Sequence, residues 1–164
     1  VNDTCESSVP SVYAVGDVNG GPQFTYISLD DFRIVFGALT GNGQYTLKDR
    51  KNIPYTTFLT PPLARVGLTE EDAINKGYTV KTKEMLVATM PRAHVNDYLK
   101  GAFKIVVNAD NDLILGATLY SQGAEELINL IKMAMDNNIP YTYFKNQIFT
   151  HPTMAENLND LCNF

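Results

Sequence analysis

Residues 101–121, GAFKIVVNADNDLILGATLYS, constrain the fold more than any other stretch of this chain of 164 residues. Two runs rich in β-branched and apolar residues flank the polar tetrapeptide ADND at 109–112. Two such runs joined by a short polar turn are typical of a β-hairpin. The stretch therefore predicts an antiparallel sheet.

Other short strands and helices surround this hairpin. Further strands are predicted at 55–59, 63–68 and 78–88. Thr69 with Asp72 three residues later is a capping pattern for a helix that Gly77 closes. A longer helix is expected over 123–137, with one apolar face formed by Leu127, Leu130, Ile131 and Ala134. Thr153 and Glu156 are expected to open a final helix, so residues 55–164 predict an α+β fold, an antiparallel sheet with helices covering one face.

The first fifty residues predict less structure. We expect a short buried strand from Val12 to Val15 that ends in Gly16-Asp17, and a helix over 24–39 that glycines terminate. The apolar face of that helix would consist of Leu29, Phe32, Val35, Phe36 and Leu39. One strand and one helix cannot form an independent core. The polar stretch 40–54 reads as a connection, and we place the domain boundary at 50, between a region 1–50 and a domain 51–164.

Composition excludes several function classes. A formal charge of −5 argues against nucleic acid as a partner. No apolar run approaches the roughly 20 residues of a membrane span, so we expect no membrane association. Cys5 and Cys162 are too few for a disulfide framework, which favours a cytoplasmic setting. Neither cysteine has metal-ligand spacing around it, so no metal site is expected.

Gly16 and Asp17 carry the first candidate site. A strand that ends in Gly-Asp before a turn and a helix places a carboxylate at the carboxyl edge of a sheet, where ligands bind in open α/β folds. That carboxylate suits a sugar or ribityl hydroxyl, and the next helix N-terminus offers N–H groups to an electron-rich group. From the pattern alone, an Asp17 that serves only a tight turn is an equal alternative.

The longer stretch SSVPSVYAVGDVNGGPQFTYISLDDFRIV resembles the second flavin-binding segment of the pyridine nucleotide–disulfide oxidoreductases. This family includes glutathione reductase, lipoamide dehydrogenase and mercuric reductase. The resemblance implies that Gly16 and Asp17 form the turn that binds the FAD ribityl chain. It also implies that the backbone near Gln23, Phe24 and Thr25 faces the flavin.

The second half resembles the dimerisation domain of the same family. TTFLTPPLARVGLTEEDA is similar to its opening signature, and HPTMAE at 151–156 is similar to its H-P-T-x-x-E motif. The resemblance implies a homodimer in which His151 and Glu156 form an acid/base dyad at the active site of the partner subunit. An imidazole suits that role because it exchanges protons near neutral pH, and a carboxylate on its other nitrogen fixes the tautomer. The stretches GGPQFTYISLDDFRIV and HPTMAENLNDL are most similar to a bacterial group related to mercuric reductase and linked to reactive-chlorine resistance.

Plainer interpretations of the same residues remain open. Thr153 and Glu156 also match a capping box, and since a carboxylate has two oxygens, both roles can coexist. Taken alone, His151 would be a structural histidine. His94 matches no motif and is expected in a loop or on the surface. We expect Cys162 to be a partly buried structural thiol.

The predicted function is that of a part of an enzyme. The parent would be an oxidoreductase that uses FAD and NAD(P)H and contributes to cell redox homeostasis by reducing a small-molecule acceptor: a disulfide, a metal ion or a quinone. The chain has no G-x-G-x-x-G after a strand and no redox C-x4-C. We therefore expect a fragment, the end of the FAD domain (1–50) plus the dimerisation domain (51–164), that is inactive alone and binds no cofactor. The alternative is a stand-alone dimerisation or protein-binding module without flavin chemistry, and flavin absorbance of the parent would separate the two.

Overall fold

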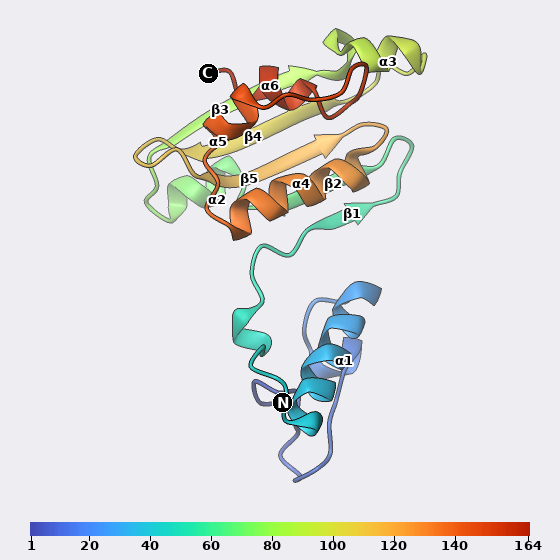
Figure 1. Cartoon of the computed structure of the whole chain (residues 1–164), viewed down its shortest axis with the longest axis vertical. Coiled ribbons are helices and arrows are strands. Elements are labelled where there is room, and N and C mark those ends of the chain that lie inside the picture. Colours follow the sequence, from blue (N-terminus) through green and yellow to red (C-terminus); the bar gives the residue numbers. More distant parts are fainter. The chain divides into compact units, whose positions relative to one another are not determined.

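The computed structural model describes all 164 residues and divides into two compact units, Val1–Lys51 and Asn52–Phe164 (Figure 1). No helix is both long and apolar enough to span a bilayer.

The second unit is built on one antiparallel sheet. Its five strands are β1 (Tyr55–Thr57), β2 (Leu63–Gly67), β3 (Val80–Leu86), β4 (Ala102–Asn108) and β5 (Ile114–Tyr120). They lie in the order β1-β2-β5-β4-β3. The β4–β5 hairpin predicted from ADND is confirmed, and it occupies the middle of the sheet, with a register shift between Val106 and Val107.

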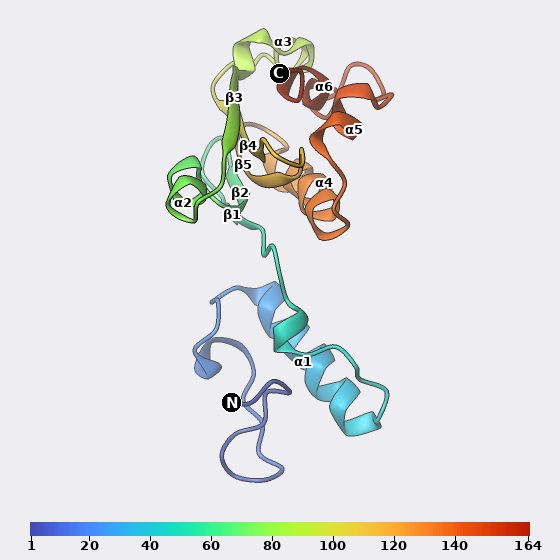
Figure 2. The same ribbon diagram turned by 90° about the vertical axis from the view of Figure 1, so that its left-hand side faces the viewer.

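Alternation along the strands separates two faces. Phe103, Ile105 and Val107 of β4 are fully buried in the core, whereas Lys104 between them points to the other face. This is the period of two that a strand imposes on its side chains. In the edge-on view, α4 (Ala124–Asp136), α5 (Tyr141–Asn146) and α6 (Asn157–Leu161) cover the core face (Figure 2). The predicted architecture is therefore confirmed, with α2 (Glu70–Asn75) added on the opposite face (Figure 2).

Two of the predicted helices have the boundaries that the sequence indicated. Thr69 and Asp72 form the predicted capping box at the start of α2. Helix α4 runs between Gly123 and Asn137, as its apolar period predicts, and it buries Leu127, Ile131 and Ala134. Two short helices were not predicted: α3 (Pro91–Val95) and α5 in the stretch that we expected to be a turn.

The predicted start of the final helix was wrong by several residues. Helix α6 begins at Asn157, with Glu156 as its N-cap, not at Thr153. The hydroxyl of Thr153 accepts the amide N–H of Glu156 and the Glu156 carboxylate accepts that of Thr153. These reciprocal bonds close a separate turn ahead of the helix.

The first unit contains one long helix. Its elements are the 3₁₀ turn η1 (Gly16–Asn19), the helix α1 (Thr25–Thr40) and the 3₁₀ turn η2 (Leu47–Asp49). Helix α1 and its glycine terminus at Gly41 were predicted correctly. The buried strand over 12–15 was not: Tyr13 makes only an isolated bridge to Glu6, and Val12 and Val15 are exposed. A strand requires a neighbour for its backbone groups, and this unit has no other strand.

The predicted apolar face of α1 also lies outside the core. Phe32, Phe36 and Leu39 are each more than half exposed, whereas Ile27, Asp31 and Ile34 are buried. The helical period was therefore correct, but its apolar face is not the face that this small unit buries.

The buried carboxylate of Asp31 organises the first unit. Its Oδ2 accepts the Gly16 amide at 2.7 Å and the Asn19 side-chain amide at 2.8 Å. Its Oδ1 pairs with the guanidinium of Arg50, whose Nε also contacts Asp30 at 2.8 Å. Asp31 therefore ties η1 and the end of the unit to the middle of α1.

We expect Asp31→Ala to destabilise the first unit by about 3 kcal/mol, because the buried Gly16 amide loses its acceptor and the Arg50 guanidinium keeps only its contact to Asp30. Hydrogen exchange of the Gly16 amide measures the effect directly, and exchange should accelerate strongly. Asp30→Asn is the matched control, since Asp30 is one-fifth exposed and contacts neither Gly16 nor Asn19. Unchanged Gly16 exchange in Asp31→Ala would contradict this role.

Cys162 lies at the end of α6, and it is fully buried rather than partly buried as the sequence suggested. Burial raises the pKa of its thiol from 9.0 to about 12, because the thiolate cannot be solvated there. The positive charge of Lys83 acts in the opposite direction and is the smaller of the two effects on this pKa.

Cys162 should therefore resist thiol reagents in the native state. A pKa raised by about three units lowers the thiolate fraction near neutral pH roughly a thousandfold. Labelling with a disulfide reagent in a Cys5→Ser background, with and without denaturant, measures this ratio. Native labelling at the rate of a small free thiol would show that the thiol is accessible.

Candidate acid–base site

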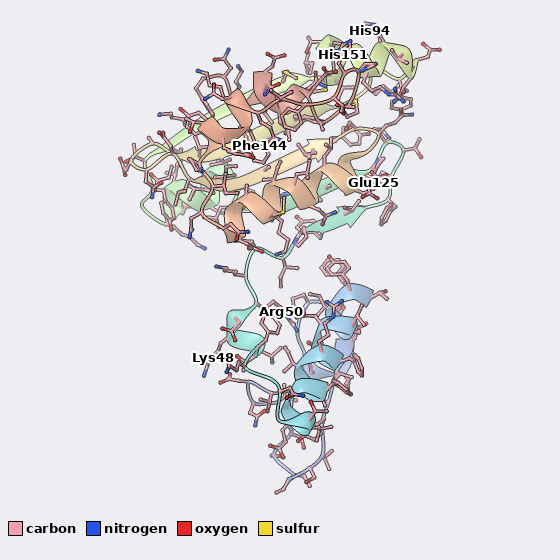
Figure 3. All side chains as sticks on the ribbon, in the orientation of Figure 1. Lys48, Arg50, His94, Glu125, Phe144 and His151 are labelled. Atoms are coloured by element: carbon pink, nitrogen blue, oxygen red, sulfur yellow. The ribbon has the colours of Figure 1, made fainter.

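His151 and Glu156 lie on the segment between α5 and α6. Figure 3 labels His151 on this segment. The imidazole Nδ1 lies 2.8 Å from the Glu156 Oε2. The ring is 68% exposed, while the carboxylate is 19% exposed. The two residues singled out from HPTMAE are therefore brought together, with the carboxylate held on the inner side.

The carboxylate of Glu156 makes both of the contacts that the sequence left open. Oε2 faces His151, and Oε1 accepts the Thr153 amide at 3.0 Å. The hydroxyl of Thr153 donates in turn to the Thr150 carbonyl at 2.8 Å. The capping interaction thus orients the carboxylate toward the ring.

The charge on Glu156 defines which nitrogen of the ring is available. The hydrogen bond from His151 is the largest cause that lowers the pKa of Glu156, and the Thr153 amide adds to it. An ionised carboxylate can only accept, so Nδ1 carries a hydrogen and a neutral ring has its lone pair on Nε2. The arrangement can accept a proton at Nε2 and return it, with the resulting positive charge facing a carboxylate.

The backbone around the ring has one further feature. The peptide bond between His151 and Pro152 is cis, as is that between Thr60 and Pro61.

The second candidate site, Gly16 and Asp17, lies in the first unit. Gly16 has φ +73°, and a Cβ there would meet the Ser28 hydroxyl at 2.6 Å, so the position requires glycine. Asp17 follows in η1 with an exposed carboxylate that has no side-chain partner. An unpaired carboxylate on a rigid turn fits the ribityl role that the resemblance implies.

Gln23, Phe24 and Thr25 lead into α1. Phe24 is the N-cap, and no side chain caps this end of the helix. Phe24 stacks on Tyr26 with 5.1 Å between ring centroids. The uncapped N–H groups of this helix start fit an electron-rich edge of a flavin ring, as the resemblance implies. The sequence contains no glycine-rich loop for the pyrophosphate of FAD.

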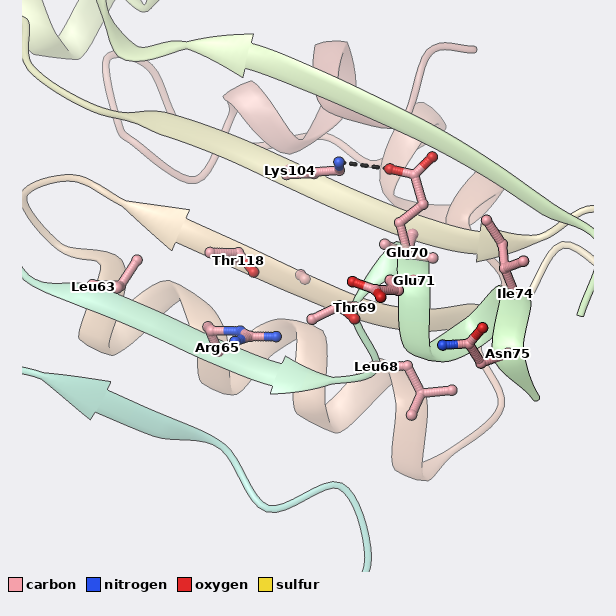
Figure 4. Close-up of a pocket in the computed structure, with 12 residues that line it drawn as sticks. Leu63, Arg65, Leu68, Thr69, Glu70, Glu71, Ile74, Asn75, Lys104 and Thr118 are labelled. Carbon is pink, nitrogen blue, oxygen red and sulfur yellow. Dashed lines mark hydrogen bonds and ion pairs between the residues drawn. The ribbon is translucent and has the colours of Figure 1, made fainter.

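Neither the second histidine, His94, nor the hollow beside α2 has the groups of an acid/base or flavin site. His94 is exposed on α3, as expected for a surface histidine, and its Nε2 lies 2.8 Å from the Ala88 carbonyl. A hollow of about 680 Å³ lies between α2 and the open face of the sheet (Figure 4). Its charged groups include the pair Lys104–Glu70 at 2.7 Å, and neither histidine nor cysteine lines it. No group of three His, Cys, Asp or Glu side chains could hold a metal ion.

Sequence reasoning missed the polar side chains that hold these sites. Asp31 supports the turn at Gly16, and Asn159 contacts the segment that leads to His151. Asp31 carried a weak signal, since this charged residue lies at helical spacing between Ile27 and Ile34, the apolar residues that α1 buries. Asn159 carried none, because its partners are backbone carbonyls twelve or more residues away.

Comparison with known proteins places these sites in a family. Residues 53–162 match the pyridine nucleotide-disulphide oxidoreductase dimerisation domain. A probable pyridine nucleotide-disulfide oxidoreductase, RclA of Escherichia coli K12, is 47% identical over 98% of this chain and 36% of its own length. A mercuric reductase of Staphylococcus aureus is 35% identical over 96% of this chain and 28% of its own length. The chain thus spans about a third of the length of these relatives.

Solved structures agree. The HOCl-induced flavoprotein disulfide reductase RclA from Escherichia coli matches with a TM-score of 0.96 and 46% identity, over 99% of this chain and 37% of that one. LpdA from Mycobacterium tuberculosis matches with a TM-score of 0.88 at 21% identity, which shows the shared fold. The resemblance to the family, and within it to a bacterial group related to mercuric reductase, is confirmed. The chain belongs to the pyridine nucleotide–disulfide oxidoreductase family and contains its dimerisation domain.

Proposed function

We propose that this chain supplies the His151–Glu156 acid/base dyad of an oxidoreductase that uses FAD and NAD(P)H, and that it does so across a homodimer interface. The observation that carries the proposal is the use of both Glu156 oxygens. One holds the Thr153 amide and the other holds the Nδ1 of a ring that is two-thirds exposed. The ring is thereby oriented from within and open at Nε2.

The chemistry follows from that orientation. A substrate thiol near Nε2 gives its proton to the ring, and the thiolate becomes the nucleophile that attacks a disulfide. The imidazolium returns the proton to the sulfur that leaves, so protons balance over the exchange. Glu156 stabilises the imidazolium between these two transfers without itself taking the proton.

The first unit would serve the cofactor. Residues 1–50 would be part of the FAD domain, with Asp17 as a ribityl contact at the turn that Gly16 forms and Gln23, Phe24 and Thr25 facing the ring system. Bound FAD would supply the redox chemistry. The domain 51–164 would supply the two-fold contact. The name of RclA, a flavoprotein disulfide reductase, supports a flavin cofactor, and the family model that matches residues 53–162 supports the position of the dimerisation domain.

The acid/base role is tested in the full-length protein by stopped-flow kinetics of His151→Gln. Flavin reoxidation by a disulfide substrate should slow by roughly 10²- to 10⁴-fold, the usual contribution of a general acid–base group. Flavin reduction by NAD(P)H should keep its rate, since hydride transfer does not use this proton carrier. Glu156→Gln should slow flavin reoxidation less, because the Glu156 carboxylate orients the ring but does not carry the proton.

His94→Gln is the matched control, because it removes the chain's other histidine from an exposed helix. Its two half-reactions should run at the parent's rates. If His151→Gln also reoxidised at the parent's rate, HPTMAE would be only a turn and helix start.

The dimer is tested by sedimentation of the chain at micromolar concentrations, where we expect a symmetric dimer. Ile148, on the segment between α5 and α6, is 95% exposed in the single chain, and burying this side chain against a partner would stabilise the dimer. Ile148→Asp should therefore weaken the dimer.

Ile74→Asp is the control for the dimer, since Ile74 is 54% exposed on α2, on the opposite face of the sheet. It should leave the sedimentation unchanged. A strict monomer of the unmodified chain would remove the basis for a dyad shared between subunits.

A further inference from the structure

The segment that carries His151 has little packing of its own at its start. It leaves α5 at Gln147, and the next residue, Ile148, is almost wholly exposed. Phe149 is the first side chain that packs partly against the core. Between the buried Phe144 of α5 and Phe149, no apolar side chain packs against the core.

Asn159 contacts the backbone at this point. Its Nδ2 lies 2.6 Å from the Phe144 carbonyl and 2.9 Å from the Gln147 carbonyl, with Lys145 further away at 3.3 Å. An amide nitrogen has two hydrogens, so the two short contacts use both and the third is shared. Asn159 thus caps the end of α5 and holds the first residue of the segment.

Helix α6, which carries Asn159, is itself fixed. Leu158 and Leu161 on either side of it are fully buried in the core. From β3, the Lys83 ammonium donates to the carbonyls of Asp160 and Asn163 at 2.8 and 2.6 Å, which ties the end of α6 to the sheet. Asn159 therefore connects the segment to an anchored element.

The geometry brings both ends of the segment to one helix. Glu156 is the N-cap of α6, and the Asn159 amide N–H bonds to the Glu156 carbonyl at 3.0 Å. The same residue holds Gln147, four positions before His151. The Asn159 side chain thus links the entry of the segment to the helix whose N-cap is the carboxylate residue at its exit.

We propose that Asn159 is a positioning residue for the His151–Glu156 pair. This proposal rests on the proposed function only because that function makes the pair the acid/base dyad. Asn159 acts through the backbone and touches neither ring nor carboxylate. Without it the start of the segment is released, the imidazole leaves its partner, and Nδ1 loses its only acceptor in this chain.

The test uses NMR of the 164-residue chain, unmodified and as Asn159→Ala. Nitrogen shifts of His151 report the tautomer, and we expect the Nδ1–H form to dominate in the parent and to give way to the Nε2–H form in the variant. Carboxyl chemical shifts report the titration of Glu156. In the unmodified chain the hydrogen bond from His151 holds the pKa of Glu156 below 4.5. Its pKa should rise toward 4.5 in Asn159→Ala, since the bond that lowers it is lost.

Asn129→Ala is the matched control. Asn129 also donates from a helix to a carbonyl, that of Glu125 at 2.9 Å, but it lies on α4 away from the segment. It should change neither the tautomer nor the titration. Asn159→Ser, which keeps one donor, should give an intermediate result, and it decides the question if the alanine variant does not fold.

Two outcomes separate this inference from the function on which it rests. An unchanged His151 tautomer and Glu156 titration in folded Asn159→Ala or Asn159→Ser overturns the positioning role. A changed tautomer supports it, even if His151→Gln leaves flavin reoxidation intact. In the full-length protein, Asn159→Ala should lower the rate of flavin reoxidation less than His151→Gln does. The pH dependence of this rate should also differ between Asn159→Ala and the unmodified protein.

Discussion

The pairing of β4 with β5 is the interaction on which the second unit depends. The hairpin lies in the middle of the sheet, so both of its strands have neighbours on both sides. Phe103, Ile105 and Leu119 from these two strands are fully buried beneath the helices. Because a shift of one residue would turn these side chains to the other face, the register of this pair determines where α4, α5 and α6 can pack.

The candidate site is a consequence of that packing. Helix α6 lies against β3 and β4 because Leu158 and Leu161 reach the core. Its N-cap, Glu156, then lies at the surface with one oxygen on a backbone amide and the other on His151. A carboxylate with a single contact would leave the ring free to rotate. The contact of the carboxylate with the Thr153 amide requires no further residue, since it is part of the turn that precedes the helix.

The sequence predicted elements whose signals are local. The ADND turn, the Thr69–Asp72 capping box and the period of α4 were read correctly because neighbouring residues decide them. The strand at Val12 was wrong because a strand depends on partners elsewhere, and the apolar face of α1 was wrong because periodicity does not say which face is covered. The start of α6 was misplaced because Thr153 and Glu156 close a turn of their own. His151 and Glu156 were found through a short motif, whereas Asn159 was not, since its partners are backbone groups on another helix.

Two polar side chains hold the two candidate sites, and their chemistry follows from what each backbone offers. The turn at Gly16 precedes a helix and presents an N–H group, so an acceptor, the carboxylate of Asp31, is required. The end of α5 presents carbonyl oxygens that can each accept a further hydrogen bond, so a donor, the amide of Asn159, is suited to this place. The ammonium of Lys83 serves the end of α6 for the same reason. A carboxylate at position 159 would face carbonyl oxygens, and an apolar residue at position 31 would leave the Arg50 guanidinium without its buried partner. Each site is therefore held by a group of the charge and hydrogen-bonding type that its helix terminus demands.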